Sequence, residues 1–370
     1  MKKRFIKLSL FALFAISFVL LPEAFAQQGA RQTDMTIDAA TKKQVIDAVL
    51  KELNDRYVFP EVAKQMEASI RQRMAGKEYD AITSAEEFAK KLTEDLQSVS
   101  RDKHLRVRYS EQTIPVRKRD GEPSAEYKTA FENNMKRINF AFEKVERLPG
   151  NIGYIKLNNF LAPELGAETV AAAMTFVTNT DALIFDLREN GGGDPEMVAL
   201  ISSYLFGDKP VHLNSLYWRE GDKTEDFFTK PNVLGKKYGD KDVYVLTANR
   251  TFSAAEEFTN NLKVLKRATI VGETTGGGAN PGGVFRVHDH FGVFVPTGRA
   301  VNPVTKTNWE GTGVEPDVKV SKELALKTAY LSALNRSYEK TKEEDLKRAL
   351  KDVIDRTQKE LDEMKKVAQK

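Results

Sequence analysis

The clearest chemistry in the sequence is that of a serine hydroxyl at a predicted strand-to-helix turn. Ser253 follows the apolar run Val243–Thr247, which is typical of a buried strand, and precedes apolar residues at helical spacing. A hydroxyl at such a turn lies at the edge of a sheet, beside the free backbone N–H groups of a helix start. Those groups would stabilise a developing oxyanion, so the position suits a nucleophile.

The same four residues also fit a purely structural role. Ser253-Ala254-Ala255-Glu256 is a capping box, in which a serine side chain caps the first turn of a helix and a glutamate reaches back to it. Caps are far commoner than nucleophiles, so this stretch alone favours the cap. The choice depends on what partners the rest of the chain offers.

Two other residues could complete a hydrolytic site. His104 follows a predicted helix at the point where a half-exposed strand begins, and an imidazole there could act as a general base. Glu310 lies in the turn-rich loop 308–317 and could orient an imidazole. Taken singly, His104 is equally an ordinary surface or capping histidine, and Glu310 a solvated loop residue.

Two glycine-rich stretches follow predicted strands. Residues 191–193 follow the strand at 182–187, and the loop 276–283 follows the strand at 269–271. Neither stretch has the lysine or the spacing of a phosphate-binding loop. The first could supply an oxyanion N–H group or form a tight turn, and the second is either a backbone-rich binding loop or a mobile surface loop.

We expect neither a metal nor a cofactor. His288 and His290 would share one face of a strand, but no third ligand is evident nearby. The chain has no cysteine, which excludes disulfides, a thiol nucleophile and thiolate metal sites.

The elements that must position these residues fall into five predicted segments. Apolar stripes at helical spacing predict a helical domain, and an alternation of strands and helices then predicts an α/β core with helices covering a mostly parallel sheet. The predicted segments are a signal peptide at 1–26, an N-terminal helical domain at 27–106, a linker or flap at 107–138, an α/β core at 139–320 and C-terminal helices at 321–370.

The first 26 residues have the pattern of an export signal. Lys2, Lys3, Arg4 and Lys7 precede an apolar run, and Ala24-Phe25-Ala26 is a small-residue cleavage site. We therefore expect an exported, periplasmic or secreted protein without a stable membrane span once the leader is removed. The formal net charge of +4 is mostly the leader's, so the remaining chain lacks the basic footprint of a nucleic-acid-binding protein.

Four stretches taken together resemble the C-terminal processing, or tail-specific, serine proteases. They occur in the order of that family over about half of the chain, and the region before His104 is similar to the family's N-terminal domain. The four stretches are 186–193 (DLRENGGG), 251–257 (TFSAAEE), 267–276 (RATIVGETTG) and 310–317 (EGTGVEPD).

Two departures from the common family pattern indicate a branch. Many members use a Ser-Lys dyad, but the loop 272–278 contains no lysine. The segment 109–135 is too short for the PDZ domain that the family often inserts there. The chain therefore resembles the branch of the tricorn protease core and the interphotoreceptor retinoid-binding protein, in which a histidine and a glutamate serve the serine.

This resemblance implies a crotonase-like (ClpP-like) α/β core and a serine endopeptidase acting on peptide or protein substrates. Ser253 would be the nucleophile, His104 the base and Glu310 its orienting partner. The N–H groups of Gly192 and Ala254 would form the oxyanion hole. The candidate substrate-binding residues are Gly191, Gly193, Gly277 and Gly278.

Two other functions stay open at this stage. The retinoid-binding relatives carry lipids on the same architecture, so the chain could be a non-catalytic protein that binds an apolar ligand. A scaffold role dominated by the terminal helices is the third reading. The narrow apolar stripe of those helices fits either packing on the core or a homo-oligomer.

Overall fold

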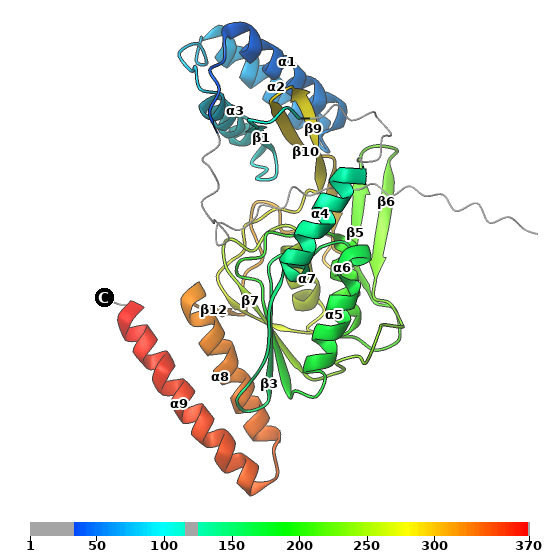
Figure 1. Ribbon diagram of the computed structural model, residues 1–370, viewed down its shortest axis with the longest axis vertical. Coiled ribbons are helices and arrows are strands. Elements are labelled where there is room, and N and C mark those ends of the chain that lie inside the picture. The colour runs from blue at the N-terminus through cyan, green and yellow to red at the C-terminus, as the bar shows by residue number, and fades with distance from the viewer. Residues whose placement is uncertain (1–32, 115–124, 369–370) are drawn as a thin grey trace, which may run out of the picture.

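The computed structural model describes residues 33–114 and 125–368, and shows a helical region, a central α/β layer and two C-terminal helices (Figure 1). This order confirms the predicted fold class. The predicted signal peptide at 1–26 lies outside the described residues. Within the described ranges, no helix combines the length and the apolar character that crossing a bilayer requires.

The N-terminal region is built from three helices with apolar faces turned inward. They are α1 (Ala39–Arg56), α2 (Pro60–Ala75) and α3 (Ala85–Ser100). The Ser84 side chain caps α3 by accepting a hydrogen bond from the Glu87 N–H at 3.0 Å. Pro60 opens α2 and Gly76 ends it.

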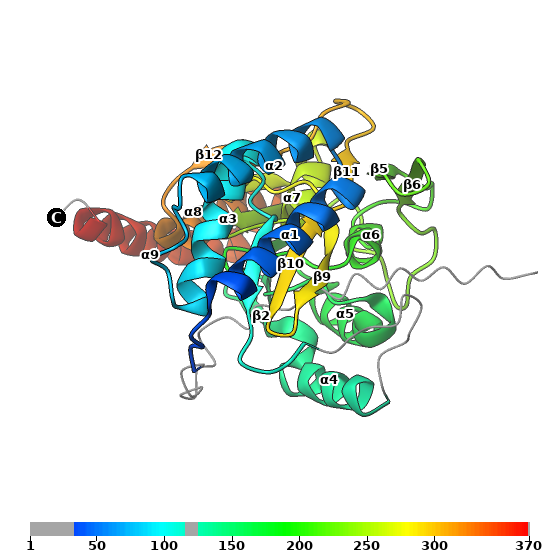
Figure 2. The same ribbon diagram turned by 90° about the horizontal axis from the view of Figure 1, so that it is seen from above.

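A hairpin from much later in the chain completes the core of this helical region. Strands β9 (Gly282–His288) and β10 (Phe291–Pro296) pair with β1 (Arg106–Tyr109) in one antiparallel sheet. Phe291, Val293 and Val295 are buried in the same apolar cluster as the helices. Viewed from above, α1 lies over this hairpin (Figure 2). The helical region is therefore fastened to the part of the chain that follows Ser253.

The central sheet has the strand order β12-β8-β7-β4-β3-β2. Strands β12 to β3 run parallel to their neighbours, and β2 is antiparallel to β3. The strands are β2 (Phe142–Leu148), β3 (Ile152–Leu157), β4 (Ala182–Asp186), β7 (Asp242–Thr247), β8 (Thr269–Gly272) and β12 (Val318–Lys319).

Alternate residues of these strands belong to two different cores. Leu183 and Phe185 face one apolar cluster, whereas Ala182 and Ile184 face the other. Because successive side chains of a strand point to opposite faces, such a strand must be apolar throughout and covered on both sides. The unbroken apolar run in the sequence reflects this position.

Helices cover both faces of the sheet. One face carries α5 (Pro163–Val177), α6 (Pro195–Ser203) and α7 (Ala254–Val264), preceded by α4 (Ala125–Arg137) and the short η2 (Asn139–Ala141). The other face carries α8 (Lys322–Lys340), and α9 (Glu344–Ala368) packs along α8. The buried residues Leu350 and Ile354 of α9 belong to the apolar cluster under α8, so this part of the stripe of α9 is covered within the chain.

A second small sheet, which we had not predicted, lies beside the core. It consists of β5 (His212–Trp218), β6 (Lys223–Phe228) and β11 (Gly298–Val301), in the order β11-β5-β6. Leu216 of β5 packs with Ala300 and Trp309 in a separate apolar cluster. This cluster forms one wall of the site described next.

Candidate active site

Ser253 lies at the start of α7, immediately beyond the carboxyl end of β7. Its backbone has φ 55° and ψ −123°, whereas an ordinary N-cap residue is in the β region. A positive φ is uncommon for a residue with a Cβ, and it persists only where surrounding contacts hold the backbone in that strained conformation. Here Thr251 enforces it, because its Oγ1 donates to Leu187 O at 2.8 Å and accepts from Ala248 N–H at 3.0 Å.

Glu256 fastens this turn to the second glycine-rich loop. Its carboxylate accepts hydrogen bonds from the N–H groups of Ser253 (2.9 Å), Gly277 (2.7 Å) and Gly278 (2.8 Å), and from the Thr275 hydroxyl (2.5 Å). Burial raises its pKa to about 7, against the lowering effect of these donors. The capping box was visible in the sequence, but the contacts with residues 275–278 were not.

The second glycine-rich loop is buried and tied down, so the interpretation as a mobile surface loop is wrong. Residues 275–280 are all buried. Gly278 O accepts from the Trp309 indole N–H at 2.7 Å, and Lys103 donates to Gly276 O at 2.6 Å. A Cβ on Gly278 would lie 2.7 Å from Cε1 of His104, so only glycine allows this approach.

The first glycine-rich turn is organised by the buried Asn190. Its side chain donates to Leu157 O at 2.8 Å and accepts from Gly192 N–H at 2.9 Å, while its carbonyl accepts from Phe252 N–H at 3.1 Å. Gly192 has φ 115°, and a Cβ there would lie 2.7 Å from Cβ of Ser253. The turn therefore touches the predicted nucleophile, and its Gly192 N–H already has an acceptor.

The other predicted glycines have different surroundings. Gly193 pairs with Phe160 in an isolated parallel bridge, and a Cβ there would clash with Phe160 O. Gly191 is exposed, and a Cβ there would meet nothing within 4 Å. The N–H groups of Gly277 and Gly278 are both used by Glu256, as described above.

His104 lies between the end of α3 and the start of β1, where the helical region joins the rest of the chain. Its ring lies 4.5 Å from the Phe252 ring and 5.7 Å from the Phe294 ring, measured between centroids. The side chain is only 10% exposed. Burial, with a smaller contribution from the charge of Arg106, lowers the pKa of His104 to about 3, so its imidazole is neutral at physiological pH.

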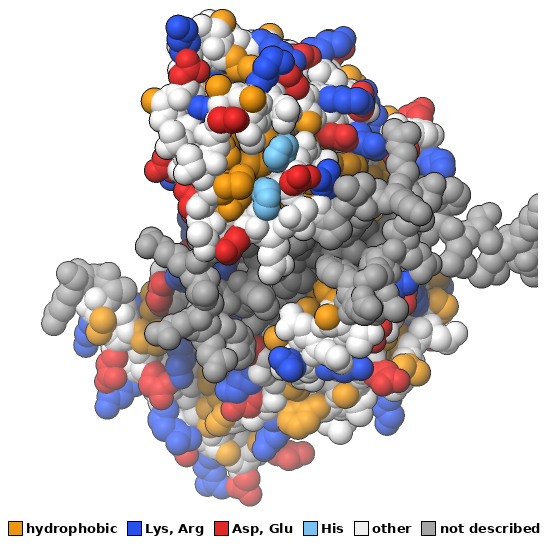
Figure 3. Space-filling view, turned by 45° about the horizontal axis from the view of Figure 1, so that its top comes forward, with side chains coloured by type: hydrophobic (Ala, Val, Ile, Leu, Met, Phe, Trp, Pro, Cys, Tyr) orange, Lys and Arg blue, Asp and Glu red, His pale blue; other side chains and the backbone are white. Residues whose placement is uncertain are grey.

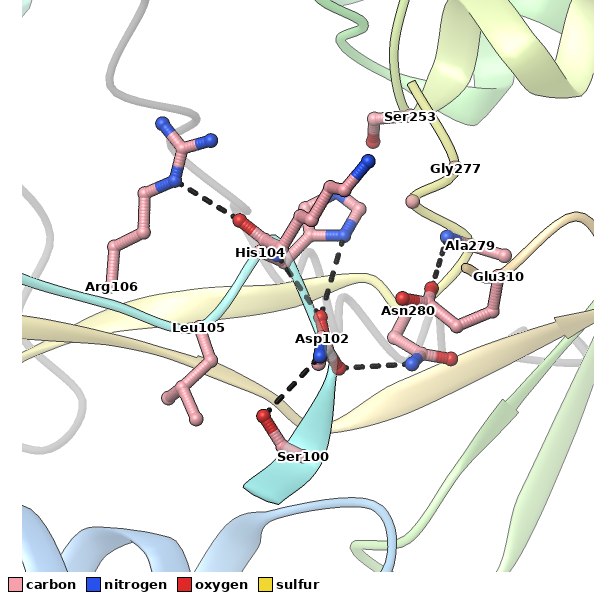
Figure 4. Close-up of polar contacts among 12 residues, drawn as sticks. Ser100, Asp102, His104, Leu105, Arg106, Ser253, Gly277, Ala279, Asn280 and Glu310 are labelled. Atoms are coloured by element: carbon pink, nitrogen blue, oxygen red, sulfur yellow. Dashed lines mark hydrogen bonds and ion pairs between the residues drawn. The ribbon is translucent and has the colours of Figure 1, made fainter. Parts of the chain in front are cut away.

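Two carboxyl groups lie beside this imidazole. Nδ1 of His104 lies 3.9 Å from Oδ1 of Asp102, and ligand atoms of His104, Asp102 and Glu310 all lie within 4.8 Å of one another. In Figure 4, Asp102 and Glu310 lie on one side of His104, and the Ser253 hydroxyl points toward the histidine from the other side. His104 therefore has its acidic partners and the serine on different sides.

Asp102 is a buried group that our sequence analysis missed. Its carboxylate accepts from the backbone N–H of His104 (3.0 Å), the Asn280 amide (2.9 Å) and the Tyr57 hydroxyl (3.2 Å). The only signal in the sequence is its position two residues before His104, which lets a carboxylate bond to the backbone N–H of residue i+2. Burial raises the pKa of Asp102 despite these donors.

The side chain of Glu310, which directly follows Trp309, also lies beside His104. Its Oε2 accepts from Ala279 N–H at 2.5 Å, while Oε1 and His104 Nδ1 are both buried without a hydrogen-bond partner. Burial and the charge of Asp102 raise the pKa of Glu310 to about 8. Two adjacent buried carboxyl groups therefore resist ionising together.

In the described part of the chain, one group of side chains has the spacing of a metal site, and it is this cluster of Asp102, His104 and Glu310. His288 and His290 do not belong to such a group. His290 is instead hydrogen-bonded through Nδ1 to Ser110 O at 3.0 Å.

A pocket opens beside the Ser253 hydroxyl. Its volume is about 30 Å³ as the space open to the centres of water-sized spheres, and its walls are mainly apolar. The lining includes Leu216, Pro281, Ala300, Trp309, Gly278 and Glu257. The site thus combines a strained serine, a neutral imidazole with two acids behind it, and a small open pocket beside the serine.

Comparison with known proteins gives two adjoining family matches. Residues 151–320 match the model of peptidase family S41, and residues 37–145 match the model described as the N-terminal domain of peptidase S41 in eukaryotic IRBP. The carboxyl-terminal-processing peptidase 1 of Arabidopsis thaliana chloroplasts is 30% identical over 186 residues, which are 49% of this chain and 36% of that relative. The matched part therefore spans little more than a third of the relative's length.

Two solved structures share the fold over most of the chain. A putative peptidase from Parabacteroides merdae is 18% identical with a TM-score of 0.51, covering 76% of this chain and 90% of that one. A lipoprotein from Streptococcus agalactiae is 16% identical with the same TM-score, covering 79% and 96%. At these identities the likeness concerns the fold alone.

Proposed function

Because the chain belongs to peptidase family S41, we propose that it is a serine peptidase that hydrolyses peptide bonds, with Ser253 as its nucleophile. The observation that carries this proposal is the meeting of Ser253, in its strained backbone conformation, with a buried neutral His104 that is backed by acidic groups. A helix cap needs neither the strain nor the histidine.

The proposed reaction follows the usual acyl-transfer sequence. Ser253 Oγ attacks the peptide carbonyl carbon while His104 takes its proton, and His104 then returns that proton to the leaving amine. Water, activated by the same imidazole, hydrolyses the acyl-enzyme. Nε2 of His104 is the atom assigned to the serine, because Nδ1 faces the acids.

We assign Glu310 as the group that orients the imidazole and stabilises its protonated form. The unpartnered Oε1 of Glu310 and Nδ1 of His104 support this assignment, since a small closure would join them. Asp102 is the competing candidate, because its Oδ1 already lies 3.9 Å from Nδ1. Contacts in unliganded sites are often long and tighten when substrate binds.

The oxyanion would be held by backbone donors. Ala254 is the first residue of α7, where N–H groups have no partner within the helix. Gly192 would be the second donor, provided that its N–H exchanges the Asn190 side chain for the oxyanion. Each donor contributes about 3 kcal/mol in comparable sites.

We propose a peptide or protein as the substrate. Gly278 lines the pocket, and the open space at Gly191 would admit a peptide backbone. For Gly193 and Gly277 the proposed role is indirect, because each holds a turn in place. The interspersed acidic and basic side chains on the face in Figure 3 offer no single-sign patch for a nucleic acid.

We further propose that the protein is exported, on the strength of the leader pattern at residues 1–26. The proposed homo-oligomer would form through apolar residues of α9 that remain exposed, such as Leu346 and Val367.

A fluorophosphonate probe tests the nucleophile directly. We expect one adduct on the purified protein, located at Ser253 by mass spectrometry, and loss of labelling in Ser253→Ala and His104→Ala. Ser321→Ala is the matched control, because Ser321 is also the N-cap residue of a helix and should leave labelling unchanged. His212→Ala is the control for the histidine.

Two results would count against the proposal. Labelling of Ser321→Ala and Ser253→Ala to the same extent would make Ser253 a helix cap. A folded wild type that resists the probe but takes up a fluorescent fatty acid or retinoid would favour the apolar-ligand binder.

A further inference from the structure

Glu257 is a buried acid at the proposed active site that the mechanism above does not use. It follows Ser253 by one turn of α7, lines the pocket and is 4% exposed. Its Oε1 is buried without a hydrogen-bond partner. This contrasts with its neighbour Glu256, whose carboxylate is fully occupied by donors.

Two buried amides lie beside Glu257. Asn214 and Asn261 are both 0% exposed and close enough to Glu257 to lower its pKa by hydrogen bonding, although their amide atoms form no hydrogen bond of good geometry. Asn261 is one helical turn beyond Glu257. Asn214 shares a face of β5 with Leu216, because residues two apart in a strand point the same way, and Leu216 lines the pocket.

The one charged group that shifts the pKa of Glu257 is Asp194, and its charge is negative. Burial raises the pKa of Glu257 to about 8, the two amides lower it, and the negative charge of Asp194 at the start of α6 raises it. No cation of the described chain is among these influences. Buried acids in native structures are usually paired or hydrogen-bonded, so this group lacks the partner expected for its position.

The walls above the cluster define the shape of that partner. They are apolar at Leu216, Pro281, Ala300 and Trp309, and Glu257 is the one acidic residue in the lining. A side chain with an aliphatic stem and a donor at its tip would bury the stem against these walls and satisfy the acid. Lysine and arginine side chains have this form, with a charged tip that donates several hydrogen bonds.

We propose that Glu257 is a specificity-determining residue, which binds the ammonium or guanidinium end of a basic substrate side chain adjacent to the scissile bond. The proposal rests on the proposed function only in that Ser253 marks the scissile bond. An apolar side chain would fill the walls but leave the acid and the amides without partners. Sites built around buried polar groups reject such analogues strongly.

Binding to an inactive variant tests this pocket without any need for hydrolysis. In Ser253→Ala, we compare peptides that differ only by lysine or norleucine at one position, scanned along the peptide, by isothermal titration. We expect lysine to be preferred about tenfold or more at one position, as for a hydrogen bond to a charged group. Adding Glu257→Gln should remove the preference while the norleucine peptide binds as before.

The control variant is Glu196→Gln on the same background. Glu196 is an exposed acid on α6, next to the pocket residue Pro195, so its removal tests for general attraction of cations. We expect it to leave the lysine preference intact. The preference in Ser253→Ala should also grow as the pH rises through about 8, where Glu257 ionises, and this growth should be absent with Glu257→Gln.

Equal affinity for lysine and norleucine at every position would overturn the inference, as would a preference that survives Glu257→Gln in a variant with an unchanged melting temperature. If the wild type hydrolyses peptides but shows no such preference, the pocket inference alone fails. If the lysine preference depends on Glu257 but the wild type hydrolyses nothing, the proposed peptidase function fails and the pocket inference stands.

Discussion

Replacing Glu256 by glutamine tests whether one carboxylate holds the site together. Oε1 accepts from the Thr275 hydroxyl and Gly277 N–H, and Oε2 accepts from the N–H groups of Ser253 and Gly278. A glutamine amide must point its NH₂ group at one of these two pairs of donors. The orientation that points the NH₂ group at Thr275 costs less free energy, because the Thr275 hydroxyl can rotate and accept a hydrogen bond from it.

Even in that orientation, the buried Gly277 N–H has no acceptor. The hydrogen bonds from the N–H groups of Ser253 and Gly278 are then made to a neutral amide oxygen and no longer to a charged carboxylate. We therefore expect Glu256→Gln to lower the free energy of unfolding by about 2–4 kcal/mol. Because the loop also holds Gly278 against His104, the rate of fluorophosphonate labelling should fall about tenfold or more.

The assay is urea denaturation at a pH of about 8, together with the labelling rate under the same conditions. Glu257→Gln is the matched control, since it changes the adjacent, equally buried acid. The folded-state pKa is raised from 4.5 to about 7 for Glu256 and to about 8 for Glu257, so ionisation of either acid costs the wild type stability as the pH rises through that range. The two acids differ in that the Glu256 carboxylate accepts four hydrogen bonds that an amide cannot all replace. The control should therefore be at least as stable as the wild type. A loss below about 1 kcal/mol for Glu256→Gln, or equal losses for both variants, would refute the reasoning.

Three further outcomes are expected. Gly192→Ala should abolish labelling, because its Cβ would lie 2.7 Å from that of the nucleophile at φ 115°; Gly207→Ala, whose Cβ would meet nothing within 4 Å, should label normally. The folded-state pKa of His104 is lowered from 6.5 to about 3, so stability falls as the pH drops below 6.5; His104→Gln should show about 2 kcal/mol less loss near pH 5 in denaturation series. Glu310→Gln should slow labelling at least about a hundredfold, whereas Asp102→Asn should slow it less and lower the free energy of unfolding by about 1–3 kcal/mol; the reverse ranking would assign the orienting role to Asp102.

Much of the secondary structure could be predicted because its causes are local. The run at 243–247 is almost entirely apolar because both faces of this strand are covered, and the structure has strand β7 there. The alternation of helix and strand likewise predicted the layered core. The strands at 212–218 and 223–228 were missed, because a small sheet at the side of the core alternates buried and exposed positions less regularly.

The residues that could perform acyl transfer, and the local elements that carry them, were predictable from the amino-acid sequence. Ser253 was placed at a strand-to-helix turn, His104 after a helix and Glu310 in a rigid loop, because turn residues and apolar periodicity are properties of short segments. The positive φ of Ser253 could not be read from its neighbours. The turn that contains it is held by Thr251, which bonds to Leu187 directly after β4.

How these residues come together depends on the tertiary packing of distant segments. The β9–β10 hairpin, from beyond Ser253, packs under the N-terminal helices and so brings the start of β1, with Asp102 and His104, against the glycine-rich loop. The pairing of Glu256 with that loop, and the unpaired state of Glu257, follow from the same long-range packing. Local sequence cannot encode them, because burial and the identity of a polar group's partner are set by segments far away in the chain.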